Sequence, residues 1–264
     1  TTVLTGGLGV GTRVFDGRAR QPGRESKRPR GLPPGAPVPA AARAAFPGSL
    51  AATGLSCAYT GGASLLACVR PAIPLAKAAG ELGRAQLLEE IAQRGHLALS
   101  EGATRRSLLA EFGAVEGGIF GAGDLLPIPA MDCAPIETED DFRPAWYSDS
   151  VRTAEGLGPM HSIVAVDMSG LFAGISFYKM TEGVLWPSFG VTLPAHALPV
   201  FRGMERTPPG SVLPTATTLR LTKGAEGQIL SIEAQGGESE AAMRISLSRS
   251  PHTKEVLSER TRVS

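Results

Sequence analysis

The spacing of apolar residues along this 264-residue chain changes near Gly158, and that change limits the folds open to it. Between residues 84 and 93 apolar side chains recur at helical spacing, and Gly95 supplies a stop signal. After Gly158, residues 162–167 and 171–178 form two runs typical of strands, which predicts a β-hairpin. Helices followed by strands predict an α+β protein, with antiparallel sheet layers and flanking helices.

The other expected elements extend these two patterns. Residues 1–50 are rich in glycine and proline and are predicted to be loop-rich, whereas residues 62–112 are predicted to be largely helical. Residues 217–221 and 228–233 are expected to pair as strands, and the polar tail from Arg249 is expected to fray.

This order predicts two portions that together form one compact unit. Residues 1–157 make a helical and loop portion, and residues 158–264 make a β portion. The acidic, turn-like stretch 137–155 is the best candidate for a linker or mobile loop.

Composition excludes several classes of protein. The 26 basic and 25 acidic residues give a formal charge of +1, so overall charge does not favour a nucleic-acid binder. No apolar run reaches the roughly 18 residues of a membrane-spanning helix, so no membrane association is expected. Residues 1–12 lack the charged and apolar regions of a secretory signal, and a cytoplasmic location is expected.

A metal site, a cofactor and a disulfide framework are not expected either. The three cysteines (Cys57, Cys68 and Cys133) are far apart in the sequence, and neither a CxxC nor an HxxxH motif is present. Zinc sites need closely spaced ligands, and an odd, sparse set of cysteines does not make a disulfide framework.

Several motifs, in order, resemble the γ-glutamyltransferase family of N-terminal-nucleophile (Ntn) hydrolases. The chain is about half the usual length of that family, yet the order of the motifs spans most of residues 6–240. The resemblance implies an Ntn-hydrolase-like fold. The motifs that carry it are a glycine-rich run at 6–11, Gly23-Arg24-Glu25-Ser26, Pro71-Ala72-Ile73, Gly117-Gly118, Asp124-Leu125, Gly190-Val191-Thr192-Leu193, Pro208-Pro209-Gly210 and Gly236-Gly237.

The nucleophile position of the family departs from its pattern. In that family the nucleophile lies seven residues before the aspartate that ends the first hairpin strand, which places Met160 in its slot. Methionine has neither a hydroxyl nor a thiol to attack an amide. Ser162 has a hydroxyl and lies on the same strand face, while the neighbouring His161 faces the other way. The alternative for residues 160–162 is that they simply begin an ordinary strand. Thr1, with a free amine and a hydroxyl, is a separate candidate nucleophile.

Arg24 and Gly236-Gly237 are the remaining candidate site residues. The resemblance implies that Arg24 grips a substrate carboxylate, which a guanidinium can do through two parallel hydrogen bonds. The backbone N–H groups of Gly236 and Gly237 can converge on an oxyanion. The plain alternatives are a solvated arginine and an ordinary turn.

Other acidic and histidine side chains do not form an acid–base set by their spacing. We expect Glu101, His96 and Asp124 to be solvated positions at helix ends. Ala195 to Leu198 occupy the place of the family's acidic pair, so the substrate ammonium lacks its partner and glutathione is not an expected substrate.

The sequence thus predicts a γ-glutamyltransferase-like amide hydrolase or acyl transferase. Its substrate is a small molecule or peptide with a free carboxylate, as in a glutamyl group. The alternative is a catalytically inactive homologue, or pseudoenzyme, that serves as a binding or assembly subunit. The sequence leaves open a protein partner or an oligomer.

Overall fold

The computed structural model of the chain describes residues 1–7, 10–26, 31–126, 157–180, 183–213, 219–223, 229–235, 242–249 and 256–263. The predicted α+β class, with antiparallel sheets and flanking helices, is confirmed. Contacts divide the chain into two units, whose boundaries differ from the predicted division at residue 157. The first comprises Thr1–Gly17, Ala130–Thr181 and Pro214–Ser264, and the second comprises Arg18–Pro129 and Glu182–Leu213.

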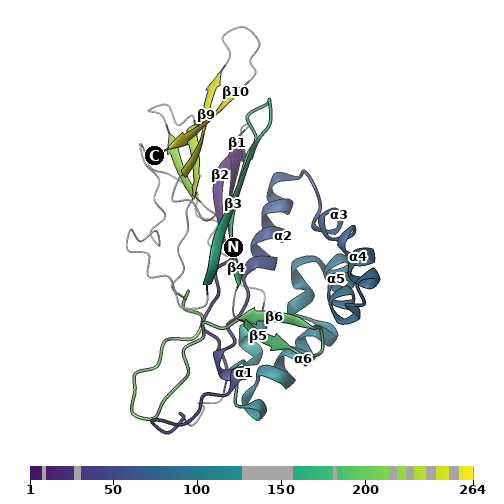
Figure 1. The fold of residues 1–264 in the computed structure, drawn as a ribbon, viewed down its shortest axis with the longest axis vertical. Helices are drawn as coiled ribbons and strands as arrows, with labels where there is room; N and C mark the ends of the chain where they lie inside the picture. The colour runs from purple at the N-terminus through teal and green to yellow at the C-terminus, as the bar shows by residue number, and fades with distance from the viewer. Residues whose placement is uncertain are drawn as a thin grey trace. The chain divides into compact units, whose positions relative to one another are not determined.

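The first unit contains two antiparallel four-stranded sheets (Figure 1). One has the order β2-β1-β4-β3 and is built from β1 (Thr2–Gly7), β2 (Val10–Asp16), β3 (Leu157–Val166) and β4 (Phe172–Met180). The other has the order β10-β9-β8-β7 and is built from β7 (Leu219–Lys223), β8 (Ile229–Gln235), β9 (Ala242–Arg249) and β10 (Val256–Val263). The two sheets meet mainly where β3 contacts β8.

The predicted hairpin of the first unit is confirmed as β3 and β4. Its turn follows from side-chain chemistry, because Asp167 Oδ1 accepts hydrogen bonds from the backbone N–H groups of Ser169 and Leu171, each at 2.9 Å. Gly170 has a φ of 89°, a conformation that favours glycine. The second predicted pair, now β7 and β8, is also confirmed.

Two expectations about the chain ends are wrong. The tail after Arg249 does not simply fray, because β10 pairs with β9 from Val256 opposite Arg249 to Val263 opposite Ala242. The glycine-rich start, expected to be loop-rich, forms β1, which lies between β2 and β4. The sequence does predict an extended run at residues 12–16, and β2 confirms it. Backbone pairing stabilises both segments, although β10 is polar and β1 contains glycine, and composition alone does not reveal a pairing partner.

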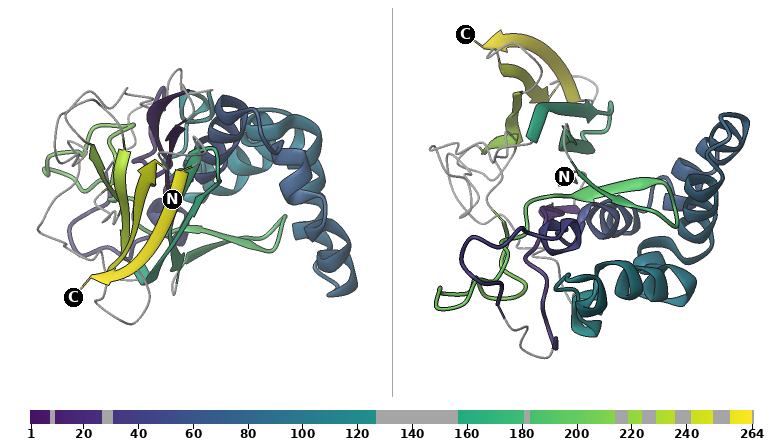
Figure 2. Two further views of the ribbon diagram at one scale, coloured as in Figure 1. Left: turned by 90° about the horizontal axis from the view of Figure 1, so that it is seen from above. Right: turned by 60° about the horizontal axis from the view of Figure 1, so that its bottom comes forward.

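The second unit combines helices with the β5–β6 hairpin (Figure 2). Its helices are α1 (Ala40–Arg43), α2 (Ser49–Thr60), α3 (Leu65–Val69), α4 (Ala72–Ala78), α5 (Leu82–Arg94) and α6 (Gly102–Phe112), with short 3-10 turns η1 (Gly95–Leu99), η2 (Ala114–Glu116) and η3 (Ala122–Leu125). Its strands are β5 (Gly183–Trp186) and β6 (Val191–Pro194). Across the described residues, no helix has the length and apolar character needed to cross a membrane.

The core of the second unit lies between α6 and the β5–β6 hairpin. Leu108 and Phe112 on α6 are buried, as helical spacing requires of an inward-facing stripe. They pack in one cluster with Trp186 of β5 and Leu193 of β6. This cluster fixes the hairpin on α6, although α6 and β5 lie far apart in the sequence.

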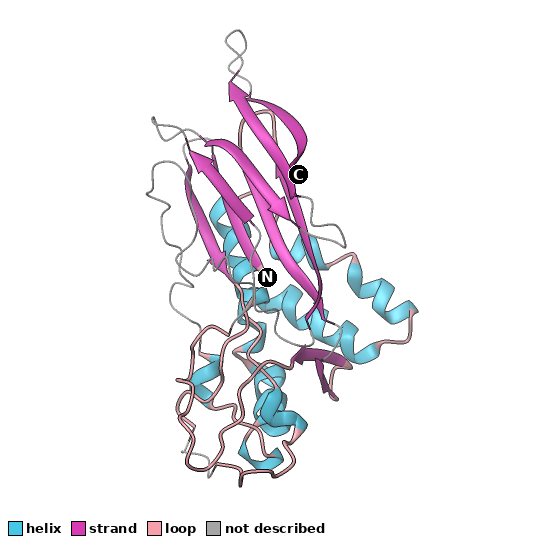
Figure 3. Cartoon of the chain, turned by 60° about the vertical axis from the view of Figure 1, so that its left-hand side comes forward, coloured by secondary structure: helices cyan, strands magenta, loops and turns pink. Residues whose placement is uncertain are grey.

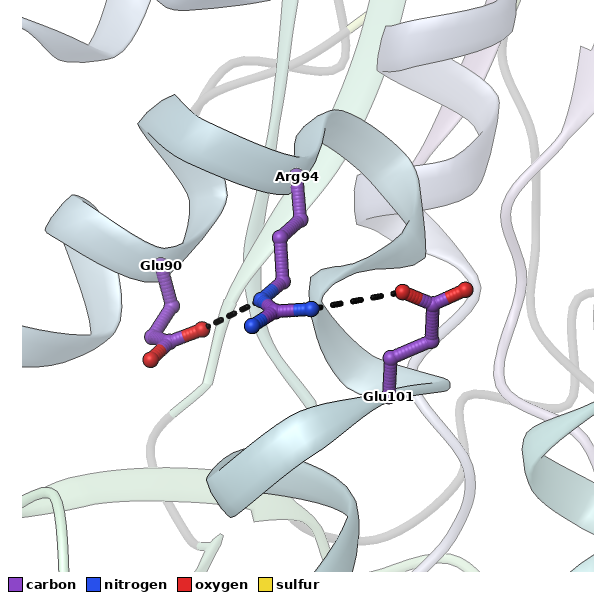
Figure 4. Close-up of polar contacts among 3 residues, drawn as sticks. All are labelled: Glu90, Arg94 and Glu101. Carbon is purple, nitrogen blue, oxygen red and sulfur yellow. Dashed lines mark hydrogen bonds and ion pairs between the residues drawn. The ribbon is translucent and has the colours of Figure 1, made fainter.

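The predicted end of α5 is confirmed at Gly95, whose φ is 61°. Arg94 lies directly before it and bridges two carboxylates (Figure 4), Glu90 through Nε at 2.8 Å and Glu101 through Nη1 at 3.4 Å. Glu101 precedes α6 and is exposed, as predicted for a solvated residue at a helix end. Exposed ion pairs of this kind contribute about 0 to 1 kcal/mol each to stability. They therefore add little to the stability of the connection between α5 and α6.

Candidate functional site

The backbone around Arg20 is paired on both edges. Arg20 and Phe46 exchange N–H···O bonds of 3.1 and 3.0 Å. On the other edge, Gln21 N–H donates to the carbonyl of Ser211 at 2.8 Å, and Gly210 N–H donates to the carbonyl of Gln21 at 2.7 Å. These hydrogen bonds on both edges fix the backbone of Arg20 and Gln21, and so the position at which the turn at Gly23 begins.

The side chain of Gln21 ties a third segment to this frame. Its buried amide donates to the carbonyl of Leu198 and accepts the N–H of the same residue, both at 2.9 Å. Residues 21–24 and 198–210 contain no helix and, apart from a bridge at Phe201, no strand pairing. Figure 3 draws loops of this kind in pink. Hydrogen bonds rather than regular secondary structure therefore position these two segments.

The carboxylate of Asp124 holds the turn at Gly23. Its oxygens accept the backbone N–H groups of Gly23 at 2.7 Å, Arg24 at 2.9 Å and Gly121 at 2.8 Å. Asp124 is only 5% exposed, so the expectation of a solvated residue at a helix end is wrong for this position. Burial raises the pKa of Asp124, and the three N–H donors and the charge of Arg24 oppose that rise.

Three guanidinium groups converge on the backbone of this turn and of the loop facing it. Arg206 Nη2 lies 3.4 Å from the carbonyl oxygen of Gly23, and Arg20 Nη1 lies 3.4 Å from that of Gly210. The side chain of Arg24 lies against Gly210, where an added β-carbon would be 2.2 Å from Nη2. Only glycine allows that approach. We refer to Arg20, Arg24 and Arg206 as the arginine cluster.

Much of the donor capacity of the arginine cluster is unused within the described residues. Arg24 is half-buried, and the hydrogen bond that it donates there comes from its backbone N–H. The Nε atoms of Arg20 and Arg206 are buried without a hydrogen-bond partner, and Arg20 as a whole is only 9% exposed. A buried donor without an acceptor costs about 1 to 3 kcal/mol.

The residue after Arg24 is strained. Glu25 has a φ of 56°, the one positive φ of a residue other than glycine in the described part of the chain. Its side chain lies against Gly123, where an added β-carbon would be 2.8 Å from Cγ of Glu25. Strain of this kind costs about 1 to 3 kcal/mol and persists only where surrounding contacts fix the backbone. Here the Asp124 hydrogen bonds fix it.

The charges beside the turn leave a positive balance. The three guanidinium groups lie on the backbone of the turn and of the loop facing it, and the carboxylates of Asp124 and Glu25 lie beside the same turn, so three minus two leaves a formal charge of +1 among these side chains. The Asp124 oxygens are already occupied by backbone N–H groups. A carboxylate matches the fork of a guanidinium through two parallel hydrogen bonds, and the cluster offers such forks at one turn.

The structure places the predicted site residues as follows. Arg24 lies in the arginine cluster of the second unit, whereas Ser162 is half-buried on β3 of the first unit, opposite Ser176 of β4. Met160 lies on the same strand, two residues earlier. Gly236 and Gly237 lie outside the described residues, and so does the whole acidic stretch 137–155. The resemblance to γ-glutamyltransferases implies that Arg24, Ser162 and the two glycines border one cavity, and this stays a prediction.

The sequence does not predict a role in the site for four residues that build it, which are Arg20, Gln21, Asp124 and Arg206. For Asp124 a local signal existed, because it stands three residues after Gly121 and its carboxylate accepts the N–H of that residue, as at a helix start. For Gln21 and Arg206 no local pattern points to the site. Their partners lie more than 170 residues away in the sequence.

No metal centre accompanies this turn in the described part of the chain, where no group of three or more His, Cys, Asp or Glu side chains is placed to hold an ion. Comparisons with family models, curated proteins and solved structures find no match to the chain. The arginine cluster is therefore the feature of the described residues that bears on function.

A second polar cluster joins α6 to the β5–β6 hairpin. Trp186 Nε1 donates to Ser107 Oγ at 2.7 Å, and the hydroxyls of Ser107 and Ser188 both donate to Glu111. Burial alone would raise the pKa of Glu111, but the hydrogen bonds from Ser107 and Ser188 outweigh it and lower the pKa. The arrangement fixes the tryptophan on the helix, and we assign it a structural role.

Replacing Glu111 with glutamine is expected to lower the free energy of unfolding by about 1 to 2 kcal/mol at neutral pH, because charge-assisted hydrogen bonds are lost. Since the folded state lowers the pKa, this stabilisation is full above the ordinary value of 4.5 and is lost as pH falls through the lowered value. Urea unfolding of wild type and Glu111→Gln at pH 7 and near pH 3 measures it. The exposed Glu116, changed to glutamine, is the control, and a pH-independent difference would contradict the assignment.

Proposed function

We propose that the chain binds a small molecule or peptide through a free carboxylate, which Arg24 and Arg206 hold at the arginine cluster. The observation that carries the proposal is the approach of both side chains to glycine backbone at one turn, with Nε of Arg206 buried and unpaired. A carboxylate at this point would accept hydrogen bonds from both guanidinium groups. It would also offset the formal charge of the turn.

A glutamyl-like ligand is the form of this proposal that the sequence supports. The Gly23-Arg24-Glu25-Ser26 motif resembles the turn that holds the substrate carboxylate in γ-glutamyltransferases. The position of Arg24 supports this form, because its backbone N–H is held by Asp124 and its guanidinium lies beside Gly210 in the arginine cluster. An Ntn-hydrolase-like fold belongs to the same proposal, as does a role in amide hydrolysis or acyl transfer.

Catalysis needs a nucleophile in addition to the carboxylate site. In the active form of the proposal, the Ser162 hydroxyl attacks the amide carbon, the amine leaves with a proton, and water later releases the acyl group. The Gly236 and Gly237 N–H groups would hold the oxyanion. Met160 in the expected slot favours the other form, in which the chain is an inactive binding or assembly subunit.

Calorimetric titration with N-acetylglutamate, which keeps the glutamyl carboxylate without a free ammonium, tests the binding function. Arg24→Leu is expected to weaken binding about thirtyfold or more, because a bidentate charge-assisted pair contributes about 2 to 3 kcal/mol. Arg24→Lys keeps the charge but loses the fork, so an intermediate loss is expected. The exposed Arg70 lies outside the cluster, and Arg70→Leu, which changes the net charge equally, is expected to bind as wild type does. Equal affinity of wild type and Arg24→Leu would overturn the proposal.

The same preparations separate the two forms of the proposal. The inactive form is expected to release no chromophore from a γ-glutamyl anilide, and its intact mass is expected to show no break between Gly158 and Ser162. Turnover that Ser162→Ala abolishes, and that a Thr1 deletion leaves unchanged, would instead establish the hydrolase.

A further inference from the structure

Two cysteine side chains meet at the corner between α2 and α3. Cys57 lies on the last turn of α2 and is half-buried, whereas Cys68 lies on α3 and is exposed. Their thiols are in hydrogen-bonding contact. This contact lies within the second unit and uses no residue of the arginine cluster.

The backbone of the corner fixes the contact. Gly61 ends α2 with a φ of 65°, and its N–H donates to the carbonyl of Cys57 at 3.1 Å. Ser64 then caps α3, because its Oγ accepts the N–H of Ala67 at 3.2 Å. The N–H of Cys68 donates to the carbonyl of Ser64 at 3.2 Å. Both cysteines are therefore hydrogen-bonded to the residues that make the reversal.

The two thiols differ in accessibility. Cys68 is exposed to solvent, so an oxidant reaches it first. Cys57 is held beside it, and burial first, then the charge and hydrogen bond of Cys68, raise the pKa of Cys57. An accessible attacking thiol with a neighbouring resolving thiol is the arrangement of a dithiol that closes on oxidation.

We propose that Cys57 and Cys68 form a reversible disulfide with a small-molecule disulfide as oxidant. The Cys68 thiolate attacks one sulfur of glutathione disulfide, which forms a mixed disulfide and expels one glutathione thiolate. The Cys57 thiolate then attacks the Cys68 sulfur and expels the second glutathione. The protein loses two electrons and two protons, and one glutathione disulfide becomes two glutathione thiols.

The disulfide would join α2 covalently to α3. Since α3 also contacts α5, the bond would hold the outer helices of the second unit to α2. The sparse cysteines do not form a disulfide framework, and this proposal concerns one pair that opens and closes with the thiol–disulfide balance.

Peptide mapping without reductant tests the proposal on the full chain. After equilibration with glutathione disulfide, remaining thiols are alkylated and the chain is digested. Trypsin leaves both cysteines in one peptide, residues 44–77, because Arg70 is followed by proline. That peptide is expected to lose the mass of two hydrogens and to escape alkylation. Chymotrypsin cleaves after Tyr59, between the cysteines, so two peptides joined only by the disulfide are expected.

Single variants supply the controls. Cys57→Ser and Cys68→Ser are each expected to lose the linked peptides and to gain a glutathione adduct on the remaining cysteine, whereas Cys133→Ser is expected to retain them. Excess dithiothreitol is expected to reverse the linkage. Stable glutathione adducts on wild-type Cys68, or linked peptides that contain Cys133, would overturn the proposal. Neither outcome bears on carboxylate binding, which is measured on reduced protein.

Discussion

Asp124→Ala is expected to lower the free energy of unfolding by about 3 to 4 kcal/mol and to abolish carboxylate binding in the same variant. The change leaves the N–H groups of Gly23, Arg24 and Gly121 without their acceptor, and each buried unpaired donor costs about 1 to 3 kcal/mol. The turn that carries Arg24 would also lose the contact that offsets the strain at Glu25. Denaturant unfolding and calorimetric titration with N-acetylglutamate measure the two effects.

Two further variants make this result interpretable. Asp124→Asn keeps the size of the side chain but replaces one acceptor oxygen with a donor group, so a loss between those of wild type and alanine is expected. Glu116→Ala removes an exposed carboxylate eight residues earlier and is expected to change neither quantity beyond about 0.5 kcal/mol. Wild-type binding by a folded Asp124→Ala variant would show that the turn does not depend on this carboxylate.

Trp186→Ala is expected to destabilise the second unit by about 3 to 5 kcal/mol, the range for removing a large aromatic side chain from a core. The indole is 1% exposed and packs edge-on to Phe112 and Phe189, with ring centroids 6.3 and 4.7 Å away. It also donates to Ser107, whose hydroxyl would lose that partner. Denaturant unfolding followed by circular dichroism checks the loss.

The adjacent residue on β5 gives a matched control. Leu185 is 57% exposed and points away from the core, so Leu185→Ala is expected to cost no more than about 0.5 kcal/mol. Similar losses for the two variants would mean that the β5–β6 hairpin does not pack on α6 through Trp186.

Elements with strong local patterns could be predicted from the sequence. The stop of α5 at Gly95 needs only a glycine that adopts a positive φ, and the buried stripe of Leu108 and Phe112 follows from helical spacing. The β3–β4 hairpin likewise depends on two strand-forming runs and on the Asp167 turn between them. Neighbours a few residues apart decide each of these features, so the sequence alone carries them.

Pairing between distant segments was decided only by the tertiary structure. β10 is polar, yet it pairs with β9 along its whole length, because backbone N–H and C=O groups, which every residue except proline provides, make the bonds. The burial of Asp124 could not be predicted either. Two of the three N–H groups that it accepts lie about 100 residues earlier, at Gly23 and Arg24.

The candidate site shows the same division. The sequence determined that Arg24 stands in a glycine-flanked turn and that its guanidinium suits a carboxylate, because those properties belong to the residue and its neighbours. Tertiary structure decided that Arg20 and Arg206 join it, since Gln21, Gly210 and Leu198 bring residues 20–24 and 198–210 together. The charge at a site depends on which side chains folding brings together there. Segments far apart in the sequence supply these side chains, so the charge cannot be read from one stretch of the chain.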